Sequence, residues 1–224
     1  MRSLKDNWFA FDDVISLSKA LGQEILNIAE KSIFEKGCFN IVLTGGQSAL
    51  NLYKILSEFD STWSKWHIYI GDERFLPMGH NDRNDKIINE IWLDNSTIPK
   101  KNIHFIKAEL GLLEARSEYE GVLKKIDKFD VVLLSMGEDG HIASLFPGHT
   151  YSKEKMVVIE YCSPKPPKER ISMSYAQLNK ATNVFKLIIG KSKQGPLDLL
   201  KKGISLPISK VYKGRERFFI SVNN

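Results

Sequence analysis

Residues 129–137 of the chain read FDVVLLSMG, an apolar run that ends in a glycine turn. A short continuous apolar run bounded by turn residues is consistent with a strand that is buried on both faces. The same order recurs at Phe39–Thr44, which precedes Gly45-Gly46, and at Trp66–Ile70, which precedes Gly71. These runs predict parallel strands at the centre of the fold.

Amphipathic helices are predicted between these strands. In Asp13–Lys36 apolar residues recur at helical spacing, and Gly37 follows as a stop signal. Further helical patterns begin at Leu50, at Ile87, at Leu113–Ile126 and at Pro196–Lys201. The other strand candidates are Ile103–Ile106, Met156–Tyr161, Ile171–Met173, Val184–Ile189 and Phe218–Val222. This alternation predicts an α/β fold with a mostly parallel sheet covered on both faces, and residues 1–224 are expected to form a single domain.

The composition is typical of a globular protein with a sizeable core. Apolar residues make up 42% of the chain and charged residues 26%, and no apolar run is long enough to span a membrane. The formal net charge of +5 fits either a lysine-rich solvated surface or attraction of an anionic partner. Because the lysines are scattered without a basic block, we expect no nucleic-acid partner, and the lack of a long apolar run predicts no membrane partner.

Cysteine usage and the N-terminus indicate the cellular compartment. Cys38 and Cys162 show neither metal-ligand spacing nor a disulfide framework, which predicts free thiols in a reducing environment. Met1–Asp13 lacks the cationic segment and apolar run of a signal peptide. We therefore expect a cytoplasmic protein, either a monomer or a weak homodimer.

Three predicted strands end in segments rich in functional groups. These segments are Thr44-Gly45-Gly46-Gln47-Ser48, Gly71-Asp72-Glu73-Arg74 and Gly137-Glu138-Asp139-Gly140-His141. Because ligands of open parallel sheets bind beyond the carboxyl ends of the strands, the three segments predict one site.

The first segment suits a phosphate. Gly45 and Gly46 let the backbone approach a ligand, and the following helix offers free N–H groups and a positive dipole end. The segment matches neither the Walker pattern nor the dinucleotide-binding glycine pattern. A simple tight turn capped by Ser48 or Thr44 is the structural alternative.

The second segment offers charged groups. Arg74 can bind an anion or polarise an oxygen, and Asp72 can orient a neighbouring group or take a proton. An exposed, salt-bridged turn is the structural alternative. His80 and Asn84 follow in a polar stretch and are possible substrate contacts, although a structural role is more typical for His80.

The third segment carries the main candidate for catalysis. His141 lies beside Asp139, after the most apolar strand, and histidine can exchange a proton near neutral pH. A buried histidine that caps a turn is the alternative. Arg170 and Lys193, each next to a predicted strand, could supply the fixed positive charge that a phosphate needs, although Lys193 alone would be ordinary surface lysine.

Taken together, these segments resemble the 6-phosphogluconolactonase family. The matching stretches are Thr44–Ala49 with Leu52-Tyr53, Gly71–Arg74 with Pro77, His80 and Asn84, Met136–Gly148, Pro167, Arg170–Ser172, and Gly190 with Lys193. The stretch Asp139-Gly140-His141-Ile142-Ala143-Ser144-Leu145-Phe146-Pro147 is the most specific. Gln47 and Ala49 depart from the residues common in the family, and the backbone cradle does not depend on the side chain at either position.

The resemblance implies a doubly wound, Rossmann-like sheet and hydrolysis of 6-phosphoglucono-δ-lactone to 6-phosphogluconate, without a cofactor or a metal. Carried over by position, it implies that His141 moves the proton, with Asp139 beside it, and that Asp72 and Arg74 orient and polarise the lactone. It also implies that Thr44–Ser48, Arg170 and Lys193 hold the phosphate.

Three alternatives are weighed on chemistry. A sugar-phosphate isomerase or deaminase of the same fold would need a glutamate where this chain has Phe146, which carries no proton. A sugar-phosphate-binding regulator would not need His141, and no DNA-reading module can be fitted to the chain. Ser144 could act as a nucleophile, but the chain has no Gly-x-Ser-x-Gly elbow, which favours direct attack by water.

Overall fold

A computed structural model of the protein describes residues 2–222. Within that range, eight strands form a central sheet in the order β1-β2-β11-β10-β7-β3-β4-β6. Their bounds are β1 Arg2–Lys5, β2 Trp8–Ala10, β3 Phe39–Leu43, β4 Trp66–Ile70, β6 Ile103–His104, β7 Phe129–Ser135, β10 Ala181–Ile189 and β11 Arg215–Ser221. All neighbours pair in parallel except β1 and β2. The prediction of a mostly parallel α/β sheet is therefore confirmed.

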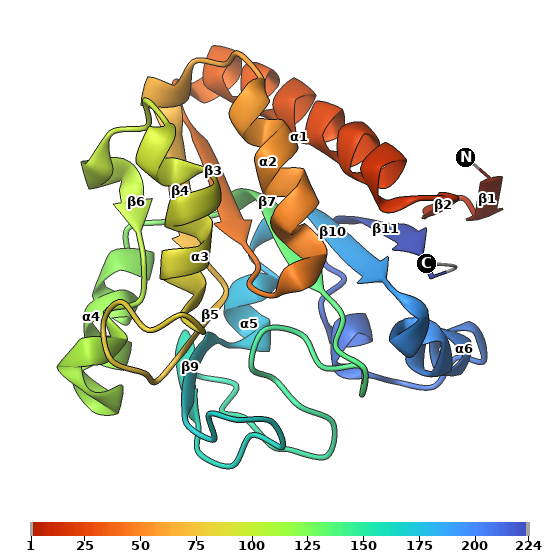
Figure 1. Ribbon diagram of the computed structural model, residues 1–224. Helices are drawn as coiled ribbons and strands as arrows, with labels where there is room; N and C mark the ends of the chain where they lie inside the picture. Colours follow the sequence, from red (N-terminus) through yellow and green to blue (C-terminus); the bar gives the residue numbers. More distant parts are fainter. Residues whose placement is uncertain (1, 223–224) are drawn as a thin grey trace.

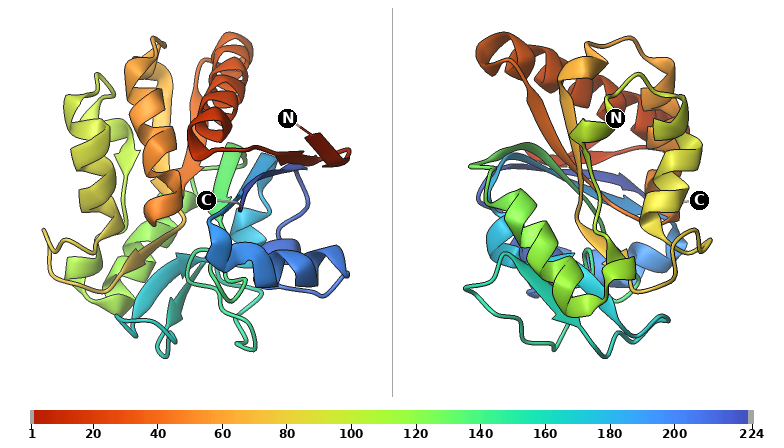
Figure 2. Two further views of the ribbon diagram at one scale, coloured as in Figure 1. Left: turned by 45° about the vertical axis from the view of Figure 1, so that its right-hand side comes forward. Right: turned by 90° about the vertical axis from the view of Figure 1, so that its left-hand side faces the viewer.

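Helices cover both faces of this sheet. On one face α1 (Val14–Lys36), α2 (Leu50–Glu58) and α3 (Asn84–Ile91) lie side by side (Figure 1). On the other face lies α4 (Leu112–Leu123), which Figure 2 shows on the side of the sheet away from α1. Two shorter helices, α5 (Tyr175–Leu178) and α6 (Gln194–Lys201), flank β10 in the chain.

The longest helix begins and ends where the sequence predicts. The Asp13 side chain accepts a hydrogen bond from the Ser16 N–H at 2.8 Å, which satisfies one free donor at the start of α1. Gly37, at φ 81°, ends the helix in the left-handed conformation that glycine adopts without steric cost. No helix in residues 2–222 combines the length and apolar character needed to cross a membrane.

A second sheet of three antiparallel strands lies beside the central one. It contains β5 (Asp72–Arg74), β9 (Arg170–Met173) and β8 (Val157–Glu160), in that order. The sequence predicts strands near the positions of β8 and β9 but predicts Asp72–Arg74 as a loop, and this last expectation is wrong. The chain leaves the central sheet at Gly71, whose N–H donates to Leu43 O while its carbonyl accepts from the Met173 N–H.

Two buried tyrosines hold the carboxyl ends of central strands. The Tyr53 hydroxyl of α2 donates to the Thr44 carbonyl at 2.6 Å and accepts from the Thr44 N–H at 3.1 Å. The Tyr119 hydroxyl of α4 makes the same pair of bonds with Ile70, at 2.8 Å and 3.0 Å. Each strand therefore ends at a fixed point, and the loop that follows starts from a defined position.

The sheet reverses its strand order between β3 and β7. From β3 the chain adds β4 and β6 on one side, and β7, β10 and β11 lie on the other. The loops after β3 and β7 diverge at this point and leave a crevice at the carboxyl edge of the sheet, where ligands of such folds bind.

Candidate active site

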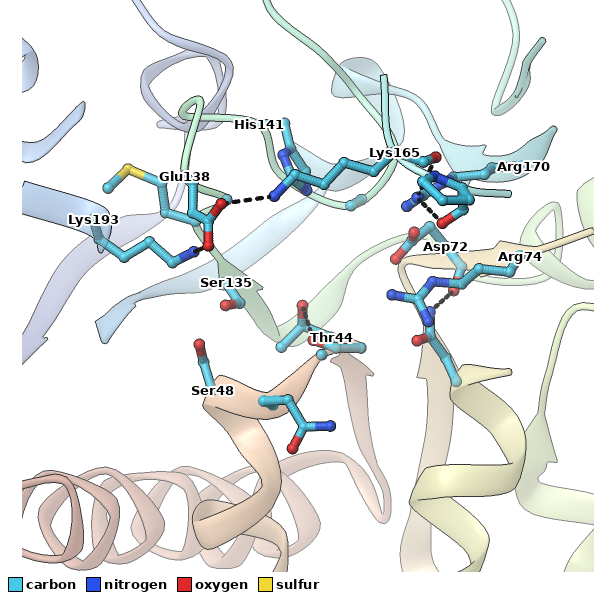
Figure 3. A pocket seen from close by; sticks show the side chains of 18 residues that line it. Thr44, Ser48, Asp72, Arg74, Ser135, Glu138, His141, Lys165, Arg170 and Lys193 are labelled. Carbon is cyan, nitrogen blue, oxygen red and sulfur yellow. Dashed lines mark hydrogen bonds and ion pairs between the residues drawn. The ribbon is translucent and has the colours of Figure 1, made fainter. Parts of the chain in front are cut away.

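A cavity of about 350 Å³ opens at this crevice, within the usual size range of small-molecule sites. Its walls include all three of the predicted segments, together with two basic residues from β9 and from the turn after β10 (Figure 3). The predicted site residues that line it are Thr44, Gly45, Gly46, Gln47, Ser48, Asp72, Arg74, Asn84, His141, Arg170 and Lys193.

The loop after β3 forms one wall with its backbone. Gly46, at φ 86°, turns the chain into a short 3₁₀ helix, η1 (Gln47–Ala49), which leads into α2. Among the described residues, no side chain caps the start of η1 or of α2. The N–H groups of this turn are therefore available to an anionic ligand, as expected for a phosphate cradle.

Asn84 joins this loop to β5. Its side-chain amide donates to the Asp72 carbonyl at 2.9 Å, and a Cβ atom added to Gly45 would lie only 2.1 Å from the Asn84 Oδ1. Oδ1 is inaccessible to solvent and has no hydrogen-bond donor among the described residues. Asn84 thus borders the cavity, but its contacts fix the relative position of Gly45 and Asp72.

His141 and Asp139 lie in direct contact at the loop after β7. The Nδ1 atom of His141 lies 2.5 Å from Asp139 Oδ1, and Asp139 also accepts the His141 N–H at 3.1 Å. Burial raises the pKa of the Asp139 carboxyl, but the hydrogen bonds and charge of His141 outweigh it and hold that pKa at about 2. Asp139 does not line the cavity itself, and its link to the cavity is its contact with His141.

Two neighbours fix the imidazole ring. Its centroid lies 4.6 Å from that of Phe146, and the His141 side chain is 16% exposed. A Cβ atom on Gly137 would lie 2.0 Å from His141 Nδ1, so only glycine leaves room for the ring at this position. Within the described side chains, Nε2 has no hydrogen-bond partner and is the ring nitrogen left for a ligand.

Asp72 is the buried carboxylate of the site. It is 4% exposed, and its Oδ2 accepts the Ser144 hydroxyl at 2.6 Å. Ser144 is itself fully buried and does not line the cavity. The Ser144 hydroxyl is donated to Asp72, and no hydrogen bond joins it to a histidine among the described residues, so Ser144 lacks the arrangement of an activated nucleophile.

Two arginines lie beside Asp72 (Figure 3). Arg74 donates from Nη1 to the Asp82 carbonyl at 2.5 Å, and its buried Nε has no partner among the described residues. Arg170 is 5% exposed and donates to three carbonyls of the loop that contains Pro166, namely those of Lys165, Pro166 and Pro167. Burial lowers the pKa of Arg170, and the charge of Asp72 opposes that shift.

Lys193 lies at the opposite end of the cavity from Arg170, on the same side as Ser48 in the view of Figure 3. It belongs to a second 3₁₀ helix, η6 (Lys191–Lys193), and burial lowers the pKa of its ammonium group. The prediction groups Arg170 with Lys193 as anchors of one phosphate, but the structure separates them. The cavity has one cationic end at Lys193 and another at Arg74 and Arg170.

Three polar side chains of the cavity were not predicted as site residues. Ser135, at the end of β7, lies near Thr44 and Ser48, while Glu138 and Lys165 lie across the mouth. Glu138 is part of the third predicted segment, and Lys165 is part of the proline-rich segment, but nothing in the sequence indicates that they meet. His80, in contrast, does not line the cavity: it is exposed, and its Nδ1 accepts the Asp82 N–H at 3.1 Å.

Comparison with known proteins identifies the family of this chain. Residues 12–220 match the family described as glucosamine-6-phosphate isomerases/6-phosphogluconolactonase. The chain belongs to this family.

Curated relatives within the family come from plants and bacteria. A probable chloroplastic 6-phosphogluconolactonase 4 of Oryza sativa subsp. indica is 36% identical over 204 residues, covering 83% of this chain and 63% of the relative. The chain thus spans less than two thirds of the length of that plant protein. A 6-phosphogluconolactonase of Thermotoga maritima is 33% identical over 87% of this chain and 89% of the relative.

Solved structures of the family share the fold. The crystal structure of the Thermotoga maritima 6-phosphogluconolactonase superposes with a TM-score of 0.88 at 30% identity, covering 95% of this chain and 98% of that one. The 6-phosphogluconolactonase of Trypanosoma brucei superposes with a TM-score of 0.87 at 24% identity, over 98% and 97% of the two chains, and at that identity it supports the fold alone.

Proposed function

We propose that the chain hydrolyses 6-phosphoglucono-δ-lactone to 6-phosphogluconate, the second step of the oxidative pentose phosphate pathway. The observation that carries the proposal is the His141–Asp139 pair. His141 lines the cavity, and its Nε2 has no hydrogen-bond partner among the described residues. The other walls of the cavity include Lys193 and the start of η1, where no described side chain forms a cap. A phosphorylated sugar lactone matches both parts of this cavity: its phosphate suits Lys193 and the N–H groups of the turn, and its lactone suits His141.

In this proposal the phosphate binds at the Lys193 end. The N–H groups at Gly46–Ser48 and the Lys193 ammonium group would hold it, with the Ser48 hydroxyl nearby. The lactone would then extend toward His141 and the second cationic end. Arg74, with its unpaired buried Nε, would stabilise the negative charge that develops on the carbonyl oxygen.

The chemical step needs only one proton carrier. His141 Nε2 takes a proton from water as the water oxygen bonds to the lactone carbonyl carbon. The bond from that carbon to the ring oxygen then breaks, and the proton on His141 passes to the ring oxygen as it becomes a hydroxyl. Asp72, held by Ser144, would orient the lactone beside Arg74.

An isomerase or deaminase reaction of the same family fits the site less well. Phe146 occupies the position that would need an acid–base group, and its ring instead packs against His141. The cytoplasm is our proposed location, supported by two cysteines that form no disulfide. The plant relatives named above are chloroplastic, so location differs between family members.

The decisive experiment follows the loss of freshly prepared 6-phosphoglucono-δ-lactone above its spontaneous rate. We expect catalysis by the intact protein and a fall in kcat on the order of 10²-fold or more for His141→Ala, because general base catalysis is worth that much. His80→Ala, which alters an exposed histidine outside the cavity, should retain the activity. Loss at the buffer rate with the intact protein would refute the proposal.

A further inference from the structure

The carboxylate of Glu138 lies between two lysines at the mouth of the cavity (Figure 3). Its Oε2 is 3.1 Å from Lys165 Nζ, and its Oε1 is 3.8 Å from Lys193 Nζ. The three side chains come from three separate segments: the loop after β7, the loop between β8 and β9, and η6. Among the described side chains, Glu138 is the only carboxylate paired with either lysine.

This carboxylate occupies a position that suits a ligand's anionic group. Lys193 is largely buried, with 13% of its side chain exposed, and it lines the same cavity as the uncapped turn at Gly46–Ser48. A lysine in such a place binds an anion more favourably than one in open water, because the cavity wall excludes part of the solvent. In the structure the anion near Lys193 is Glu138.

The pairing is weak enough to be replaced. At 3.8 Å the contact with Lys193 is longer than a hydrogen bond, and 54% of the Glu138 side chain is exposed to water. Exposed pairs of this kind contribute little to stability. A phosphate carries more negative charge than a carboxylate and could also accept hydrogen bonds from the N–H groups of the turn.

We propose that Glu138 sets the affinity of this site for anions: its carboxylate competes with the phosphate of a ligand for Lys193 and Lys165, and so weakens the binding of phosphorylated ligands. This inference rests on the proposed function, because it takes the Lys193 end as the phosphate position. A neutral sugar lactone leaves the Glu138 pairs in place and gains nothing from the two lysines. A phosphorylated lactone replaces Glu138, and the same competition weakens binding of the phosphorylated product.

The test compares Glu138→Gln with Glu154→Gln. Both variants remove one negative charge, but Glu154 is an exposed residue that does not line the cavity. Binding of inorganic phosphate and of 6-phosphogluconate is measured by calorimetry at constant ionic strength. Neither probe is hydrolysed, so their dissociation constants can be measured whether or not the protein proves to be a lactonase.

We expect both dissociation constants to fall about threefold to tenfold in Glu138→Gln, the range spanned by one or two weak ion pairs. They should be unchanged in Glu154→Gln. Glu138→Asp keeps the charge but shortens its reach, and we expect it to lie between the wild type and Glu138→Gln. Unchanged dissociation constants in Glu138→Gln would show that Glu138 does not affect anion binding. Higher dissociation constants would show that Glu138 positions the lysines for the anion. Either result overturns the proposal.

Discussion

At the scale of single residues, the chemistry of His141 depends on which ring nitrogen carries the proton. Asp139 lies 2.5 Å from Nδ1, and its pKa of about 2 keeps it ionised at any pH at which the protein would work. An ionised carboxylate only accepts, so the neutral imidazole holds its hydrogen on Nδ1. Nε2 is then left unprotonated, as a general base requires.

Asp139→Asn should therefore impair catalysis more than binding. The amide can present an N–H to Nδ1 and favour the opposite tautomer, which places the hydrogen on Nε2. We expect kcat to fall on the order of 10²-fold or more, with little change in KM, in steady-state assays with fresh lactone. Asp127→Asn, at an exposed position outside the cavity, is the matched control. A kcat near the wild-type value would argue against the orienting role.

Some residues of the site can be predicted from the sequence, and others cannot. The positions of His141, Asp72 and Lys193 at the cavity are predictable because each lies in a segment that follows an apolar strand, and strand ends meet at one edge. Glu138 and Lys165 are charged residues of exposed loops, and only tertiary contact brings them together. The separation of Arg170 from Lys193 likewise depends on β9 belonging to the second sheet, which local sequence does not reveal.

At the scale of elements, the best-predicted strands are those buried on both faces. The predicted bounds of β4 and β7 agree with the structure, and β3 differs by one residue, because each apolar run is short, contains β-branched or aromatic residues and is followed by a glycine turn. Asp72–Arg74 has no apolar pattern and forms a strand only because β9 lies beside it. β1 and β2 at the edge of the sheet were not predicted either.

The contact between Gly45 and Asn84 provides a test at this scale. In Gly45→Ala the new Cβ would overlap the buried Asn84 amide, so the loop after β3 must move away from β5. We expect kcat/KM to fall about tenfold or more in Gly45→Ala. In an Asn84→Ala background the same substitution should lower kcat/KM by a smaller factor, because the effects of mutations at contacting residues are not additive. Gly121→Ala in α4, where an added Cβ meets no atom within 4 Å, is the control. Strictly additive effects would exclude the proposed contact.

At the scale of the whole molecule, one hydrophobic core extends from Trp8 to Ile220 and includes residues of both sheets. This continuity supports our proposal that the chain is a single domain. At the β6 edge of the central sheet, His67 and His104 stack with their ring centroids 5.8 Å apart. Burial, with a smaller contribution from His67, lowers the pKa of His104 to about 4.

Acid should destabilise the protein through this histidine. His104 is neutral in the folded state down to about pH 4, whereas the unfolded chain takes up the proton near pH 6.5, so the unfolded state binds more protons between these values. We expect the free energy of unfolding in urea to fall by roughly 1 kcal/mol or more from pH 7.5 to pH 4.5 on this account. The fall should be smaller in His104→Gln and unaltered in His80→Gln. Equal pH dependence in all three proteins would contradict the assignment.

The two tyrosine hydroxyls that hold Thr44 and Ile70 have a consequence for the entropy of ligand binding. A strand end that is free to fray must be ordered each time a ligand arrives, and that loss of freedom weakens the complex. Here the ordering takes place once, when α2 and α4 pack against the sheet during folding. The floor of the cavity is therefore preorganised, and any adjustment to a ligand is left to the side chains and loops above it.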